Sequence, residues 1–335
     1  METLLKMQVN PSKSSGPNLN TPLHIAALGD NLPGVKLLLS YGADIEKFNL
    51  HRYTAFLTAM ESSNRETVEF FIENLEMWKN VLNLNLWSEK HGQCPIHSIL
   101  RNNIPGVVQY IYRLLQSGVS PNNVNMRGNT PLLEALYVRD HETALSITRA
   151  LIKFGAEANY FNTEGICPLF RAVSSKDPKL VGALFEIKTM DVNFVNMFRL
   201  TPLFYCVSHS KNKTIAHMLM KAGADPTIKG AFTMRGAVVD TASTMLVALV
   251  NHETTLLELF FEYGYVIERK WFQRHYCHSP AWTHARTLAN KVPSLKSLAR
   301  QSVRAGFKNS EKIPSRRTVE SLPLPKTLIE YVAFY

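Results

Sequence analysis

The side chains best suited to chemistry in this chain of 335 residues are four cysteines, Cys94, Cys167, Cys206 and Cys277. Cysteine thiolates bind zinc, and they act as nucleophiles when a nearby base or metal lowers their pKa. These four are far apart, form no Cys-x-x-Cys pair, and have no evident histidine base beside them in the sequence. We therefore expect free, mostly buried thiols in a reducing compartment and a protein that is not an enzyme.

Histidines are the next candidates for metal ligands. His275, Cys277, His278 and His284 lie close together, but their spacing fits no common zinc site. The sequence also has no glycine-rich phosphate loop. We expect no catalytic residues, no metal and no other cofactor.

Basic residues are concentrated at one end of the chain. Lys and Arg number 37 against 27 Asp and Glu, a net charge of +10, of which residues 265–335 contribute +9. Nucleic-acid-binding proteins usually carry a basic face over their main body, so we expect no nucleic acid partner and interpret the run as a solvated face or a contact to an acidic protein. The first ten residues lack a secretory signal, and no run reaches the roughly 18 apolar residues of a membrane span. We expect no membrane contact and a cytoplasmic location, with a nuclear one left open.

A four-residue pattern recurs along the chain at intervals of 33 to 42 residues. In its clearest copy, Thr21-Pro22-Leu23-His24, the threonine can cap a helix and the proline suits the first helical position. Gly42 follows 21 residues after Thr21 and can adopt the left-handed conformation that ends a second helix. The copies begin at Thr21, Thr54, Cys94, Thr130, Cys167, Thr201 and, in the weakest form, Ser243.

Each copy therefore predicts a helix, a turn, a second helix and a turn back. A single unit of this kind cannot bury its apolar face, so neighbouring units must stack. Over residues 18–268 the chain resembles the ankyrin repeat family, which implies an all-α fold, a solenoid of about seven helix-turn-helix repeats. His24 and His97 occupy the last position of the tetrad, where histidines of that family hydrogen-bond the backbone.

The longer intervals and the flanking segments complete the predicted organisation. Insertions are expected around Met77–Leu86 and Ile228–Val239. Residues 1–17 are expected to form a flexible tail, because they are rich in Ser, Pro, Asn and Lys. Residues 269–292 are expected to cap or link the last repeat, with Trp282 among the capping aromatics.

Residues 293–335 form a separate predicted module of two short helices. The first carries one narrow apolar stripe, and Leu322-Pro323-Leu324-Pro325 precedes the second. A module of this length cannot make a sizeable core, so its exposed apolar side chains require a partner.

This module resembles the SOCS box, whose first helix in that family carries an elongin-binding box. Ser294-Leu295 and Val303 match the box, but Ala299 stands where the family has cysteine. The later Leu-Pro-aliphatic-Pro segment of the family selects cullin-5, and here the match is complete. The resemblance assigns elongin C binding to Leu295, Leu298, Ala299 and Val303, and cullin binding to Leu322, Pro323, Leu324 and Pro325.

Ankyrin repeats followed by a SOCS box are the layout of the ankyrin repeat and SOCS box family. The resemblance implies a substrate-recognition subunit of a cullin-RING E3 ubiquitin ligase, with elongin B/C, cullin-5 with its RING protein, and an unknown substrate protein as partners. The chain lacks the roughly eight Cys and His ligands of a RING module of its own. The alternative is an ankyrin-repeat scaffold without a ligase role, in which residues 293–335 only cap the array.

The substrate-binding surface of such an array would include the loop tips that precede each tetrad. Two tips carry arginine where the family usually has glycine, at Arg52 and Arg199. Aromatic side chains accompany them, and both residue types are common in binding hot spots. The tip residues predicted to bind substrate are Phe48, Arg52, Tyr53, Phe198 and Arg199. The other interpretation, which the sequence leaves open, is that the rings pack between neighbouring tips.

Overall fold

The computed structural model describes residues 10–265 and 280–290, apart from residues 63, 79–80, 86–93, 103 and 235–236. The chain divides into two compact units, Met1–Glu164 and Gly165–Tyr335. Each unit is built from pairs of short helices, and seven such pairs occur among the described residues. An inner helix begins at each copy of the tetrad, and an outer helix follows it.

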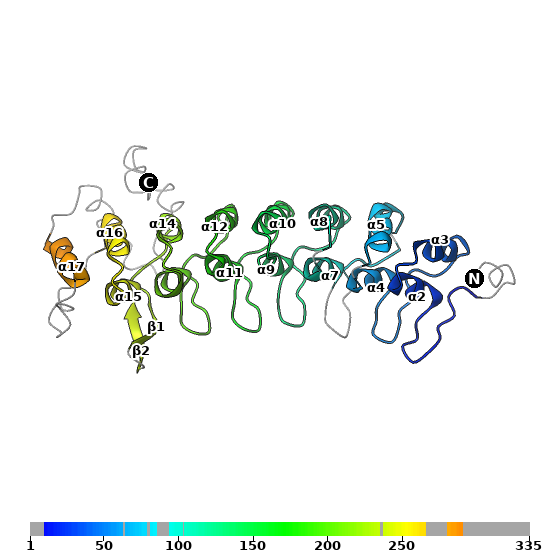
Figure 1. Ribbon diagram of the computed structural model, residues 1–335, viewed down its shortest axis with the longest axis horizontal. Coiled ribbons are helices and arrows are strands. Elements are labelled where there is room, and N and C mark those ends of the chain that lie inside the picture. Colours follow the sequence, from blue (N-terminus) through cyan, green and yellow to red (C-terminus); the bar gives the residue numbers. More distant parts are fainter. Residues whose placement is uncertain are drawn as a thin grey trace. The chain divides into compact units, whose positions relative to one another are not determined.

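In the first unit the inner helices contact one another in succession, and so do the outer helices, which gives two layers (Figure 1). The inner helices are α2 (Pro22–Leu28), α4 (Ala55–Glu61), α7 (Pro95–Asn102) and α9 (Pro131–Ala135). The outer helices are α3 (Leu32–Ser40), α5 (Arg65–Glu73), α8 (Val107–Gln116) and α10 (His141–Lys153). A short helix, α6 (Leu75–Trp78), follows α5 at the start of the first predicted insertion.

The second unit has the same two layers. Its inner helices are α11 (Pro168–Ser175), α13 (Pro202–Tyr205) and α15 (Thr244–Val250), and α13 continues into a π-helical turn, η1 (Cys206–Ser210). Its outer helices are α12 (Pro178–Leu184), α14 (Lys213–Lys221) and α16 (Thr254–Glu262).

The second predicted insertion contains a β-hairpin, an element that the sequence analysis does not predict. Strands β1 (Lys229–Met234) and β2 (Ala237–Ser243) pair antiparallel, with an irregularity between Gly230 and Phe232. Both strands contact α15. Gly230 lies close to the loop tip that precedes Thr201. A Cβ added to Gly230 would be 2.8 Å from the carbonyl oxygen of Arg199.

Side-chain caps explain where the inner helices begin. The hydroxyl oxygens of five caps accept a hydrogen bond from the backbone N–H three residues later, over 3.0 to 3.3 Å. Such a cap stabilises a helix by about 1 kcal/mol. These caps are Thr21, Thr54, Thr130, Thr201 and Ser243. The predicted left-handed glycine at the end of the second helix is confirmed as well, because Gly42, directly after α3, has a φ of 77°.

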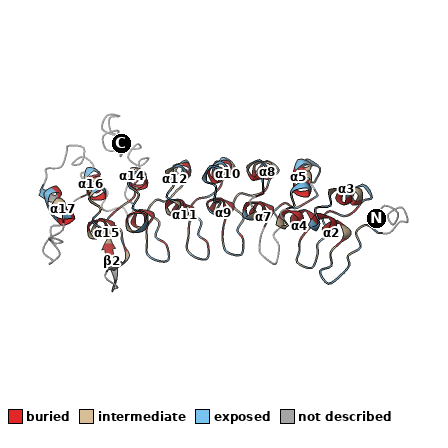
Figure 2. Ribbon diagram, in the orientation of Figure 1, coloured by how far each residue is buried: buried red, intermediate tan, exposed pale blue. Residues whose placement is uncertain are grey.

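The core of each unit lies where the helix layers meet. Leu23 of α2 and Leu38 of α3 are almost fully buried, and Phe56 of α4 meets Phe71 of α5 edge to face at 5.7 Å. Figure 2 shows the buried residues on the facing sides of the helices. Burying a side chain of this size stabilises the fold by about 1.5–3 kcal/mol, so stacking rather than any single repeat holds each unit together.

The helix α17 (Pro280–Asn290) packs against α16 and α15 in the second unit. Ala281, Trp282, Ala285 and Leu288 are its buried residues. Within the described part of the chain, no helix is both long and apolar enough to cross a membrane.

Candidate protein-binding surfaces

The loop tips before the inner helices are built around asparagines. Asn49 Oδ1 accepts hydrogen bonds from the backbone N–H groups of His51 and Tyr53, both at 3.0 Å. Asn125 and Asn196 accept the equivalent pairs of bonds in their own tips, over 2.9 to 3.0 Å. Each tip therefore has a defined conformation that presents the residues after the asparagine.

The third residue after each of these asparagines, and after Asn162 in the tip before Cys167, has a left-handed backbone. Gly128 and Gly165 have φ values of 69° and 70°, and Arg52 and Arg199 have φ values of 57° and 58°. Glycine adopts this conformation without strain. A residue with a Cβ pays about 1–2 kcal/mol of strain energy there, so each of the two arginines carries that strain. Such strain is often found at functional sites, which keeps these two tips as candidates.

Close packing explains why the tips before Thr130 and Cys167 retain glycine. A Cβ on Gly128 would lie 3.1 Å from Asn162 Cα, and a Cβ on Gly165 would lie 2.7 Å from Met197 Cγ. In both cases the next tip along the chain fills the space.

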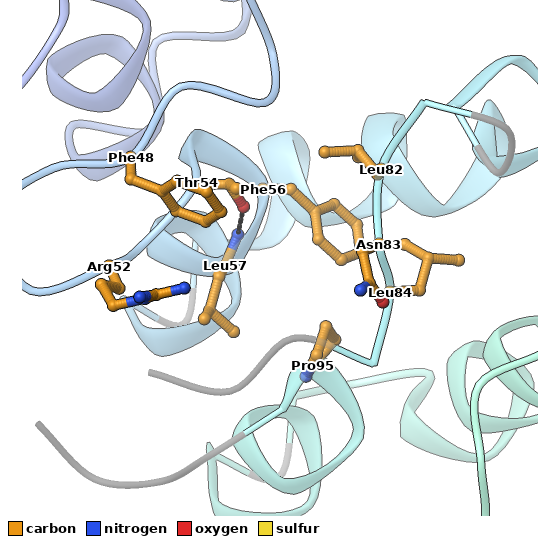
Figure 3. A pocket seen from close by; sticks show the side chains of 9 residues that line it. All are labelled: Phe48, Arg52, Thr54, Phe56, Leu57, Leu82, Asn83, Leu84 and Pro95. Carbon is orange, nitrogen blue, oxygen red and sulfur yellow. Dashed lines mark hydrogen bonds between the residues drawn. The ribbon is translucent and has the colours of Figure 1, made fainter. Parts of the chain in front are cut away.

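The first arginine tip borders a hollow in the first unit, shown in Figure 3. The Arg52 guanidinium lies over the Phe48 ring at 5.6 Å, and both side chains are exposed. Leu82 and Leu84 line the opposite side, and the hollow holds about 270 Å³ of empty space, part of it open to solvent.

Tyr53, in contrast, is only 9% exposed. Its carbonyl oxygen accepts a hydrogen bond from His24 Nε2 at 2.8 Å. The structure therefore places Tyr53 in the packing between repeats, whereas Phe48 and Arg52 remain at the surface.

The second arginine tip belongs to the second unit. Phe198 is 59% exposed and Met197 is 64% exposed, and Arg199 is exposed as well. Large apolar side chains at this exposure are typical of interaction surfaces when they cluster. Phe198 and Arg199 are therefore adjacent surface residues, and their role in substrate binding stays a prediction.

The predicted contacts of the C-terminal module, Leu295 to Val303 and Leu322 to Pro325, lie outside the described residues, as do His275, Cys277 and His278. In the described ranges, no group of three or more His, Cys, Asp and Glu side chains is arranged to hold a metal ion.

The expectation that no cysteine has a histidine base beside it is wrong for Cys94. Its Sγ lies 3.0 Å from His97 Nδ1, because the two residues occupy the first and last positions of the tetrad. Burial raises the pKa of the Cys94 thiol, but the hydrogen bond and the charge of His97 outweigh it and leave that pKa below the ordinary value. For His97, burial lowers the pKa, and the bond to Cys94 raises it to a net value above the ordinary one.

This pair is not exposed to a substrate, because Cys94 and His97 are each 1% exposed. His97 Nε2 bonds the Asn129 carbonyl oxygen at 3.0 Å, as His24 bonds Tyr53. The predicted backbone hydrogen bonds of the tetrad histidines are thus confirmed. The pair joins two repeats in the way the Thr21–His24 pair does, and its geometry is that of a structural contact.

The other two described cysteines are also buried. Burial raises the pKa of the Cys167 thiol to about 11 and that of the Cys206 thiol to about 12. Both thiols are therefore protonated at neutral pH and poor nucleophiles.

Two family models match the chain. The model described as ankyrin repeats (3 copies) matches residues 1–81 and 141–230, which together are more than half of the chain. The SOCS box model matches residues 291–333.

Curated relatives share part of the chain. The ANK repeat-containing protein nipk-1 of Caenorhabditis elegans is 28% identical over 199 residues, which are 54% of this chain and 31% of the relative. The transient receptor potential cation channel subfamily A member 1 of Homo sapiens is 25% identical over 170 residues, 48% of this chain and 14% of the relative. The chain therefore spans less than a third of the length of either protein.

Among solved structures, the chain is similar to the crystal structure of the ankyrin repeat domain of Bcl-3, a unique member of the IkappaB protein family. The TM-score is 0.51 at 21% identity, and the match covers 69% of this chain and 94% of that one. At this identity the likeness shows the fold alone, and it confirms the predicted ankyrin repeat fold.

Proposed function

The chain belongs to the ankyrin repeat and SOCS box family, and from that premise we propose that it is the substrate-recognition subunit of a cullin-RING E3 ubiquitin ligase. The observation that carries the proposal is the SOCS box match at residues 291–333, which begins directly after α17 ends at Asn290. In this proposal the repeats hold a substrate protein, and the C-terminal module binds elongin B/C and cullin-5 with its RING protein.

The roles within the C-terminal module follow from its two motifs. Leu295, with Leu298, Ala299 and Val303 on the same helical face by spacing, binds elongin C. The Leu322-Pro323-Leu324-Pro325 segment binds the cullin.

Ala299 weakens the elongin contact without abolishing it. Losing the sulfur of a buried cysteine resembles losing one methylene, about 0.8 kcal/mol, with a small addition for the void. That corresponds to roughly a four- to tenfold loss in affinity. Leu295 contributes more, about 1.5–3 kcal/mol for a fully buried leucine.

Ubiquitin transfer would then depend on proximity rather than on chemistry by this chain. The assembled ligase holds a charged ubiquitin-conjugating enzyme near substrate lysines, and the high effective concentration drives the reaction. The three described cysteines are buried, which is consistent with an adaptor that takes no part in the thioester steps.

The test is capture of elongin B/C by the full-length chain on co-expression. Leu295→Asp places a charge in the proposed apolar contact and is expected to abolish capture. Leu50→Asp is the matched control, because Leu50 is a 52% exposed leucine in a tip of the first unit. Elongin capture that survives Leu295→Asp, or that is absent from the wild-type chain, would refute the proposal.

Deletion of residues 293–335 separates the proposal from the scaffold alternative. Trp282, Ala285 and Leu288 of α17 are already buried at the end of the second unit. We therefore expect the truncated chain to keep the melting temperature of the wild type while losing elongin. A truncated chain that melts lower and aggregates would support the scaffold alternative.

A further inference from the structure

The turns that join inner to outer helices are basic in the second unit. The residue directly before the cap of the outer helix is left-handed in each repeat of this unit, at Lys176, Lys211 and His252, with φ values of 52° to 62°. In the first repeat of the chain the equivalent left-handed residue is Asp30. Glycine fits this conformation more easily than any of them. The second unit therefore has basic side chains where a glycine would suffice for the turn.

The π-helical turn η1 brings Lys211 to the same place as Lys176. Lys176 is nine residues after the first residue of its tetrad, whereas Lys211 is ten residues after the first residue of its own. The wider turn, in which the Lys211 N–H donates to the Cys206 carbonyl oxygen at 2.7 Å, takes up the extra residue. Beside it the rings of Tyr205 and His209 stack, with centroids 4.7 Å apart. Two consecutive repeats therefore present a lysine at equivalent positions.

Contacts between neighbouring turns hold these lysines side by side. Asn212, which caps α14, donates from Nδ2 to the Lys176 carbonyl oxygen at 3.4 Å. Lys211 Nζ lies 3.3 Å from Glu253 Oε1 in the turn of the next repeat. Lys213, the first residue of α14, follows Asn212 directly. We call Lys176, Lys211 and Lys213 the lysine ridge.

The charge of the lysine ridge is accessible from solvent. Its three lysines are exposed, and in the described part of the chain neither Lys176 nor Lys213 forms an ion pair. The bridge between Lys211 and Glu253 joins side chains that are 50% and 25% exposed. Such surface pairs contribute little to stability, so a carboxylate from a partner can replace Glu253. Asp177, the other carboxylate of these turns, is half-buried and accepts a backbone N–H of α12 at 2.8 Å.

Helix ends make the same surface more positive. The first turns of α12 and α14 contain no acidic residue, although the positive end of the helix dipole favours one there. Lys213 occupies the first position of α14, where the dipole disfavours a cation. The first unit differs, because α5 and α10 carry Glu66 and Glu142 in their first turns. A lysine at the start of α14 is unfavourable for folding, and an anion bound to the ridge would offset that.

We propose that the lysine ridge docks an extended acidic segment of a partner protein. Packed helices lie about 8–10 Å apart, and an extended chain rises about 3.1–3.4 Å per residue, so carboxylates at every third residue reach successive turns. The turn residues 176–179, 209–213 and 250–254 hold four Lys and two acidic residues, a net charge of +2 with histidines neutral. A protein that makes about 6–10 phosphate contacts to a nucleic acid needs a wider basic surface, so a protein segment fits better.

The ridge is separate from the surface proposed for the substrate. A loop tip precedes each inner helix and a turn follows it, so tips and turns lie at opposite ends of the inner helices. A partner on the ridge therefore leaves the tips open. Docking on the ridge goes beyond the proposed function and does not depend on a ligase role.

The experiment measures binding of a fluorescein-labelled peptide to the full-length chain by fluorescence anisotropy at low salt, where surface charges are least screened. The peptide carries glutamate at every third position, with proline and alanine between, so that it stays extended. The variant Lys176→Gln, Lys213→Gln should bind about fivefold more weakly, as expected for two exposed charge contacts. The variant Lys176→Arg, Lys213→Arg keeps both charges and should bind within about twofold of the wild type.

A matched control removes two lysines from other surfaces. Lys13 in the first unit and Lys229 at the start of β1 are both exposed. The variant Lys13→Gln, Lys229→Gln has the same net charge as the glutamine variant of the ridge and should bind within about twofold of the wild type. Equal losses in the two variants would mean attraction to the overall charge of +10 and would overturn the proposal.

Other outcomes also overturn the proposal. No binding by the wild type, unchanged binding by the glutamine variant, an arginine variant as weak as the glutamine variant, or equal binding of a peptide with glutamine in place of glutamate would each reject the site. A single-stranded DNA oligomer that binds more tightly than the peptide, and is weakened equally in the glutamine variant, would assign the ridge to nucleic acid. All the substituted lysines are exposed, so the variants should keep the wild-type melting temperature. Elongin capture by the same variants tests the ligase role separately, because none of these residues lies in the SOCS box.

Discussion

Replacing Arg199 with glycine is expected to stabilise the second unit, because the backbone at this position is left-handed with a φ of 58°. A side chain in this conformation costs about 1–2 kcal/mol relative to glycine. The greater freedom of glycine in the unfolded chain offsets about 0.5–1 kcal/mol of that gain. The net increase in the free energy of unfolding should be about 0.5–1 kcal/mol, which raises Tm by roughly 1–4 °C for a unit of this size.

The matched control is Arg199→Ala. Alanine removes the same guanidinium group but keeps a Cβ, so the difference between the two variants isolates the backbone conformation. Thermal melting of both variants, followed by circular dichroism, measures that difference. A glycine variant no more stable than the alanine variant would refute the argument from φ.

The reverse change at the equivalent glycine checks the same reasoning. Gly165 has a φ of 70°, and a Cβ there would lie 2.7 Å from Met197 Cγ. Gly165→Ala should therefore lower the free energy of unfolding by about 0.5–1 kcal/mol from the backbone alone, once the smaller freedom of alanine in the unfolded chain is counted. Displacement of the Met197 side chain adds to this loss. An unchanged melting curve for Gly165→Ala would contradict both the strain and the packing.

Two other predictions concern the tetrads. Cys167 caps α11 without a side-chain hydrogen bond, so Cys167→Thr should raise the free energy of unfolding by about 1 kcal/mol in urea melts, and Thr201→Cys should lower it. An effect of the opposite sign would show that the buried sulfur packs better than a hydroxyl. Burial lowers the pKa of His24 below its ordinary value of 6.5, against a smaller upward effect of its bond to Tyr53. Its stabilising effect is therefore full above pH 6.5 and is lost as the pH falls, and His24→Gln should show a shallower loss of stability on acidification. Equal pH slopes for the wild type and this variant would contradict the prediction.

The repeat was predictable because its marks are local. Thr21 and Pro22 start a helix through their own backbone and hydroxyl chemistry, and Gly42 ends the next one through its own φ. The weak copy at Ser243 was found for the same reason, since its hydroxyl caps α15 just as the threonines cap the other helices. The left-handed conformation of Arg52 and Arg199 likewise follows from their place in the tip rather than from their chemistry.

Features that depend on neighbours were harder to predict. The hairpin of β1 and β2 has a signal in the sequence, an Arg-Gly pair between two stretches that contain β-branched residues, but the long repeat interval there predicts only an insertion. The contact of Cys94 with His97 follows from their spacing in the tetrad and not from adjacency in the sequence. Tyr53 is next to an exposed arginine, yet it is buried, and its carbonyl oxygen bonds His24, a residue 29 positions earlier. The π-helical turn η1 has no recognised composition, so the stack of Tyr205 and His209 becomes visible only in three dimensions.

The three described cysteines, Cys94, Cys167 and Cys206, are buried and free, and each belongs to a different repeat. A thiol-alkylating reagent can reach them only when the surrounding helices open. The labelling rate of each cysteine therefore measures how often its repeat opens. Cys94 reports on the first unit, and the other two report on the second. Native labelling rates, resolved by peptide mass, would therefore show whether the repeats open singly or together, without any engineered probe.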